Sequence, residues 1–188
     1  IREREESKGK ENKGFPVCRM TMDLTKIVNS MIAYDDNRII LGAKDELQLL
    51  DCSNKSITPI STEHKGRINC VIKLSNNDII TAGQDKTIKV WKIDNKNSIM
   101  TLEGHTSMIW CINEIKGNKL ISGSSDNRAL IWDLNEKKLD FELYNDKEIS
   151  VVVQLKTGNV LLCSSNQLIL FNLEEKKHKN CCNSDNDN

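Results

Sequence analysis

The stretch HTSMIWCINEIKGNKLISGSSDNRALIWDL, residues 105–134, decides the fold of this 188-residue chain. It divides into three apolar segments, MIWCINEI, KLISGS and RALIWDL, joined by KGN and SSDN, which are rich in turn-forming residues. Short apolar segments with such turns between them are typical of antiparallel β-strands. The stretch also contains His105, Ser122 and Asp126, the residue types of a hydrolytic triad. The first question is therefore whether these three residues form an active site.

The same pattern occurs once more, 41 residues earlier in the chain. In that copy, HKGRINCVIKLSNNDIITAGQDKTIKVWKI, a shift of 41 places His64 on His105 and Trp91 on Trp132. Two weaker copies flank this pair, with Leu50 and Phe171 at the position of the tryptophan. Each copy is followed by a fourth segment, such as KNSIMTLEG or KKLDFELYN. Units of about 40 residues with four short strands each predict an all-β fold built by radial repetition.

Two short motifs carry a family resemblance. GH at 104–105 and IWD at 131–133 resemble the WD40-repeat family, whose repeats form the blades of β-propellers. The preceding copy is a second match, with HK in place of GH and WK in place of WD. The resemblance covers about residues 15–173 and implies a WD40-type β-propeller with about four blades.

The repeat phase also predicts the domain organisation. Four units are expected, at about 15–50, 51–91, 92–132 and 133–173. The two ends of the chain are charged or polar and poor in apolar residues, which predicts disorder. These ends are the N-terminal stretch 1–14 and the polar tail 174–188. Pro59 lies in the fourth segment of its unit, where a residue without an N–H donor is expected on a solvent-facing edge strand.

Two interpretations of the blade count stay open. WD40 propellers usually have about seven blades, so four units favour part of a larger ring, and the absence of an initiating Met agrees with this. Alternatively, the four blades close on themselves. In that case FPVCRMTM at 15–22 supplies the outer strand of the last blade, because the continuation of that blade is too polar to pair convincingly.

The resemblance implies a structural answer to the question about the triad. In WD40 repeats a histidine, a hydroxyl, an aspartate and a tryptophan form a hydrogen-bond network that satisfies the buried tryptophan N–H. By position the networks are His64, Thr81, Asp85, Trp91 and His105, Ser122, Asp126, Trp132. The set occurs twice at equal spacing and one copy uses threonine, which is not the pattern of a catalytic nucleophile. No catalytic residue is therefore predicted.

A partner-binding surface is implied at the narrow end of the propeller channel. The positions that WD40 domains use there correspond to Arg67, Asn69, Gln84, Met108, Trp110 and Ser125. Neighbouring blades would extend this row with Lys26, Val28, Ala43, Glu148, Ser150 and Ser165. Exposed Trp and Arg are frequent anchors of protein interfaces. The alternatives are that Trp110 packs between blades, that Arg67 is only a solvated charge, and that Met108 is a packing residue.

Composition excludes several classes of function. The chain has 27 basic and 27 acidic residues, so no overall field attracts nucleic acid or an anionic membrane. No apolar run is long enough to span a membrane. The seven cysteines are odd in number and include no C-x-x-C pair, which favours reduced thiols in the cytoplasm, with the nucleus as an alternative. The HKNCC tail is a poor chelator, so neither a metal site nor a cofactor is predicted.

The sequence thus predicts a non-catalytic WD40 scaffold that binds a protein or peptide. The alternative is the substrate-targeting or regulatory propeller of a larger multidomain enzyme, a ubiquitin ligase or a kinase, with its catalytic domain upstream. A propeller enzyme is the third hypothesis. It requires an ionisable cluster in the central channel, and no such cluster occurs at matching positions.

Overall fold

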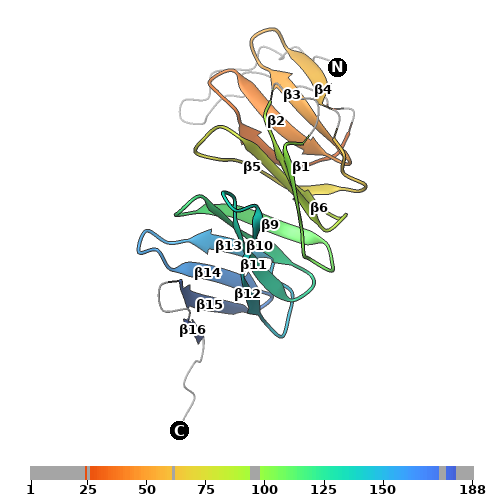
Figure 1. Ribbon diagram of the computed structural model, residues 1–188. Helices are drawn as coiled ribbons and strands as arrows, with labels where there is room; N and C mark the ends of the chain where they lie inside the picture. The colour runs from red at the N-terminus through yellow and green to blue at the C-terminus, as the bar shows by residue number, and fades with distance from the viewer. Residues whose placement is uncertain (1–23, 25, 61, 94–97, 174–176, 181–188) are drawn as a thin grey trace, which may run out of the picture.

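The computed structural model describes residues 24, 26–60, 62–93, 98–173 and 177–180. These residues form four sheets, each of four antiparallel strands that follow one another in chain order (Figure 1). We refer to them as sheets one to four. Sheet one contains β1 (Val28–Ala33), β2 (Arg38–Ala43), β3 (Glu46–Asp51) and β4 (Ser56–Ile60), and sheet two contains β5 (Ile68–Lys73), β6 (Ile79–Gly83), β7 (Thr87–Trp91) and β8 (Met100–Glu103). Sheet three contains β9 (Ile109–Ile115), β10 (Lys119–Ser124), β11 (Arg128–Asp133) and β12 (Lys138–Tyr144), and sheet four contains β13 (Val151–Gln154), β14 (Val160–Ser164), β15 (Gln167–Asn172) and β16 (Lys177–Asn180).

The second strand of each middle sheet is covered on both faces. All five residues of β6 are buried, and in β10 only Lys119 is partly exposed. A strand that is buried on both sides has no need of alternating polar residues. This explains why IITAG and LISGS read as continuous runs of apolar and small residues.

The hydrophobic core consists of three clusters, each between two consecutive sheets. Between sheets two and three, for example, Ile88 and Leu102 pack with Ile112 and Trp132. The other two clusters lie between sheets one and two and between sheets three and four. The first strands of consecutive sheets, β1, β5, β9 and β13, are also in contact. Each sheet is therefore stabilised mainly by its neighbours, as in other repeat architectures.

The described sheets form an open arc. Sheet one and sheet four lie at opposite ends of the array (Figure 1). The face of sheet four that points away from sheet three carries Val151, Val153 and Leu168, which are 40% or more exposed. These four sheets do not close on themselves, in agreement with the interpretation of a partial ring.

The structure confirms the predicted all-β fold and its strands. β9, β10 and β11 match the three apolar segments of the best repeat, and Pro59 is exposed on the edge strand β4.

One prediction about the C-terminal tail is wrong. The residues after Leu173 were expected to be too polar to pair, yet Lys177–Asn180 form β16 along β15. Strand pairing uses backbone donors and acceptors, so an outer edge strand needs no apolar side chains. The predictions for 1–14 and 15–22 lie outside the described residues.

Candidate functional site

In sheet three the four predicted network residues meet in the interior. Trp132 Nε1 donates to Ser122 Oγ at 2.8 Å, and His105 Nε2 lies 2.8 Å from the same oxygen. The other ring nitrogen, Nδ1, lies 2.8 Å from Asp126 Oδ2. Ser122 is 0% exposed and Trp132 is 2% exposed. The chain of contacts thus runs from a buried indole N–H to a carboxylate whose side chain is itself only 3% exposed.

The direction of the protons follows from the environment of His105. Burial lowers the pKa of this histidine, and the neighbouring Asp126 opposes that effect only in part. A neutral ring that donates from Nδ1 to the carboxylate has an acceptor left at Nε2. The hydroxyl of Ser122 then donates to Nε2 and accepts from Trp132. This tautomer is assigned from the network of partners rather than from observed hydrogens.

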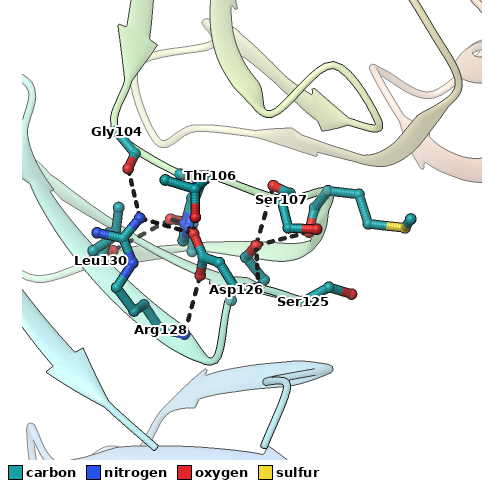
Figure 2. A network of polar contacts seen from close by, with 12 residues as sticks. Gly104, Thr106, Ser107, Ser125, Asp126, Arg128 and Leu130 are labelled. Atoms are coloured by element: carbon teal, nitrogen blue, oxygen red, sulfur yellow. Dashed lines mark hydrogen bonds and ion pairs between the residues drawn. The ribbon is translucent and has the colours of Figure 1, made fainter.

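Asp126 is held by donors from three directions. The backbone N–H of Thr106 donates to Oδ2 at 2.8 Å and Arg128 Nη2 lies 2.9 Å from the same atom (Figure 2). Burial alone would raise the pKa of this carboxyl, but these donors and His105 outweigh it and lower the pKa to about 2. Asp126 therefore stays charged at neutral pH.

Arg128 belongs to the same network, and the sequence did not single it out. Its Nη2 also donates to the carbonyl of Gly104 at 2.7 Å, and its Nη1 donates to Glu142 at 3.1 Å. The guanidinium thereby joins the loop before β9 to the outer strand β12. In sheet two, Thr87 also lies two residues after the aspartate, Asp85, and donates to its carboxylate. A polar residue at this position of the repeat was therefore the sequence signal that could have predicted the role of Arg128.

Steric crowding explains why the GH motif has a glycine at position 104. A Cβ added at Gly104 would lie 2.9 Å from Cη2 of Trp132. The loop therefore passes directly over the buried indole, and only glycine allows that close approach.

Sheet two repeats the arrangement with threonine in place of serine. Trp91 Nε1 donates to Thr81 Oγ1 at 2.8 Å, and His64 Nε2 lies 2.7 Å from that oxygen. His64 Nδ1 lies 2.8 Å from Asp85 Oδ2, which also accepts from the backbone N–H of Lys65. Burial would raise the pKa of Asp85, but His64 and the backbone donors lower it to about 2.

These networks are suited to holding a loop rather than to hydrolysis. A nucleophile must reach its substrate, and both Ser122 and Thr81 are 0% exposed. Each hydroxyl oxygen is occupied by an indole N–H and a histidine ring. Among the described residues no buried side-chain nitrogen or oxygen lacks a hydrogen-bond partner. The networks thus satisfy buried polar groups and tie the loops before β5 and β9 to their sheets.

The six predicted partner-binding positions differ in exposure. Arg67, Gln84 and Trp110 are exposed, with Trp110 at 40%, whereas Asn69, Met108 and Ser125 are partly buried. In the extended row Glu148, Ser150 and Ser165 are exposed, but Ala43 is 0% exposed and cannot contact a partner.

A β-bulge at the start of the first strand fixes the direction of two of these side chains, Asn69 and Trp110. In sheet two Ile68 pairs with Gly83 and Cys70 with Ala82, so Asn69 is left without a partner residue. The same shift leaves out Asn29 in sheet one and Trp110 in sheet three. Bulges redirect the side chain of the extra residue.

The bulge residues of sheets one and two link neighbouring sheets. Asn29 Nδ2 donates to the carbonyl of Ile68 at 3.2 Å, and Asn69 Nδ2 donates to the carbonyl of Ile109 at 2.8 Å. The amide of Asn69, predicted to bind a partner, is thus already used inside the protein. The two asparagines are 40 residues apart, so the repeat carried a signal for this shared role.

Trp110 also reaches toward the next sheet, but it bonds to side chains and stays exposed. Its Nε1 donates to Ser125 Oγ at 2.7 Å and to Glu148 Oε2 at 3.2 Å, and Ser125 Oγ donates to the same carboxylate oxygen at 2.8 Å. The indole is therefore fixed by its only polar atom while the side chain stays exposed. Trp110 is thus partly exposed and partly in contact with the segment before β13, so both interpretations of this residue stay open.

Comparison with known families agrees with this geometry. The family model "WD domain, G-beta repeat" matches residues 56–92 and 96–133. These segments are WD40 repeats. No curated protein matches the chain in a sequence search.

Solved structures show the same WD40 fold. A structure described as "Structure of U3-55K" matches with a TM-score of 0.75 and 15% identity, over 85% of this chain and 53% of that chain. A second, "Crystal structure of RRP9 WD40 repeats", gives 0.74 and 15%, over 85% and 52%. The chain therefore spans about half the length of these two WD40 proteins, and at this identity the likeness shows the fold alone.

The described part of the chain holds neither a metal-binding cluster nor a membrane-spanning helix. No group of three or more His, Cys, Asp or Glu residues there is placed to hold a metal ion. No helix in that part has the length and apolar character that crossing a membrane requires.

Proposed function

We propose that this WD40 chain is a non-catalytic scaffold that binds a protein or peptide through the surface around Trp110. WD40 propellers generally act as protein-interaction platforms, and the buried networks of sheets two and three offer no accessible nucleophile. One observation supports the location most directly. At the bulge where sheets one and two use a structural asparagine, sheet three carries a tryptophan that is 40% exposed.

Trp is the residue most enriched at the centres of protein interfaces. Arg67, Gln84 and Glu148 are exposed at the corresponding ends of their sheets and could form the polar rim of the same surface.

Nucleic acid fits this surface less well. The carboxylate of Glu148 touches the indole N–H, so a phosphate near Trp110 would meet a like charge. The chain as a whole is neutral and offers no compensating field. The free thiols of Cys52, Cys70, Cys111 and Cys163 support a reducing compartment, and we place the protein in the cytoplasm or nucleus.

The test is affinity capture from a cell extract with the tagged chain, followed by mass spectrometry. We expect Trp110→Asn to lose a protein that the wild type retains, because the substitution removes the anchor and restores the asparagine of the other sheets. Lys116→Ala is the matched control, since Lys116 follows the opposite end of β9. An identical set of captured proteins for all three chains would contradict the proposal.

A further inference from the structure

The contacts of Trp110 also define what kind of group can bind it. Indole has one polar atom, and its N–H is engaged by Ser125 and Glu148. The exposed part of the side chain is therefore ring carbon. The face of an indole ring attracts cations through its quadrupole, and tryptophan does so most strongly of the aromatic side chains.

Glu148 places a negative charge beside this ring. Its Oε2 accepts from Ser125 and from Trp110, and both donors are neutral. Among the described residues no Lys, Arg or His lies within ion-pair distance of this carboxylate. The ammonium of the adjacent Lys147 instead lies 3.3 Å from Asn166 Oδ1. The carboxylate is thus oriented by its two donors and has no ion-pair partner among the described residues.

The position of this pair comes from the fold rather than from a flexible loop tip. Trp110 is the bulge residue of β9, and Ser125 follows β10 directly, with its N–H donating to the carbonyl of Met108 at 3.0 Å. Glu148 precedes the fully buried Ile149, whose N–H donates to the carbonyl of Ser124 at 3.0 Å. These backbone bonds fix the segments that carry Ser125 and Glu148, and the bonds among the three side chains orient the indole, which lowers the entropic cost of binding.

We infer that Trp110 and Glu148 form a recognition site for an arginine side chain of a peptide or protein partner. A guanidinium is planar, so it can stack on the indole while its N–H groups donate to the carboxylate. Lysine offers a compact charge without the stacking surface and is the weaker ligand here. This inference rests on the proposed function and narrows it to a basic partner segment.

The experiment uses blocked arginine, N-acetyl-arginine amide, titrated into the ¹⁵N-labelled chain and followed at the indole N–H signals by NMR. The chain has three tryptophans, and Trp110→Asn assigns the responding signal. We expect that signal to shift saturably with blocked arginine and not with blocked citrulline, which has the same shape without the charge. Trp91 and Trp132 are buried, so their signals should not respond.

Glu148→Gln separates the charge from the hydrogen bonds. Glutamine retains an oxygen that can accept from Ser125 and Trp110, so the ring should stay in place. We expect the Kd for blocked arginine to rise by about three- to tenfold, the range of a charge-assisted bond at a partly exposed site. In Lys116→Ala the Kd should be unchanged.

An equal response to citrulline, or an unchanged Kd in Glu148→Gln, would overturn the inference. The proposed function fails differently. If the captured protein still depends on Trp110 while blocked arginine causes no shift, the scaffold role stands and the arginine site is wrong. If blocked arginine binds but capture does not depend on Trp110, the proposed role of this surface fails while its ligand chemistry stands.

Discussion

Sheets three and four have the same strand order, but different chemistry holds their third strands. In sheet three Trp132 is fixed by Ser122, His105 and Asp126. In sheet four the tryptophan and serine positions hold Phe171 and Leu162, which are 2% and 3% exposed and pack in one apolar cluster. The histidine position holds Asn145, whose Nδ2 donates to Ser164 at 2.7 Å, so this position still bonds the loop to its sheet.

The difference shows that the third strand of a sheet can be held either by a tryptophan with its hydrogen-bond network or by an apolar side chain alone. An indole N–H in the core demands an acceptor, and the acceptor in turn demands the rest of the network. A phenylalanine removes the donor, and every other member of the network can then be replaced. In sheet three the polar network fixes the loop before β9 to the sheet. In sheet four the third strand is held by apolar packing.

The largest expected effect is at Phe171. Replacing it with alanine removes a buried ring that lies 5.8 Å from Phe141 between centroids, and should lower the free energy of unfolding by about 3–5 kcal/mol. Urea denaturation followed by circular dichroism measures this. Leu168→Ala is the control, because Leu168 is 40% exposed and should cost less than about 1 kcal/mol. Equal losses would mean that sheet four is not held by its apolar cluster.

A smaller effect is expected at Ser122. Ser122→Ala leaves the indole N–H of Trp132 and a ring nitrogen of His105 without their partner, and should cost about 1–3 kcal/mol. Leu162→Ser is the reciprocal change in sheet four. It introduces the same hydroxyl where the third strand carries a phenylalanine in place of a tryptophan, and it should also lower the free energy of unfolding. If Leu162→Ser were neutral, the two positions would not be governed by the presence of an indole donor.

The smallest effect is the dependence on pH. Burial lowers the pKa of His105 in the folded protein below its ordinary value of 6.5. As pH falls below about 6.5, the unfolded chain therefore binds a proton at His105 more readily than the folded chain does, and stability should decline. Asp126 has a folded pKa of about 2 against an ordinary value of 3.8, so its contribution is present above about pH 4 and is lost as pH falls toward 2. That contribution is at most about 2.5 kcal/mol, because a tenfold difference in proton affinity between the folded and unfolded chain corresponds to about 1.4 kcal/mol.

Thermal unfolding at pH 7, 5, 4 and 2 tests the sign. The melting temperature of the wild type should fall over this range. Asp126→Asn should be less stable at pH 7 and should lose less stability than the wild type between pH 4 and 2, since the amide cannot titrate. A parallel decline in both chains would assign the acid sensitivity to other groups, among them Asp85, whose pKa is also about 2.

Much of the fold could be read from the repeat. The equal spacings from His64 to Thr81 and from His105 to Ser122 predicted partners that the structure brings within 2.8 Å. Arg128 was missed because its role depends on reaching Gly104 and Glu142, which lie on other segments. The exposure of Trp110 was left open because a bulge changes the side-chain direction that simple alternation would give.

The sequence by itself determined the number and order of the strands and the members of the buried networks. The strands are encoded in apolar periodicity, the network members in the resemblance to WD40 repeats, and both recur after 41 residues. Only the tertiary structure decided that the four sheets form an open arc and that Lys177–Asn180 pair with β15. It also decided that Trp110 meets Glu148, 38 residues further along the chain. These features depend on how sheets pack and on where a bulge points a side chain, and neither is written in the residues of one strand.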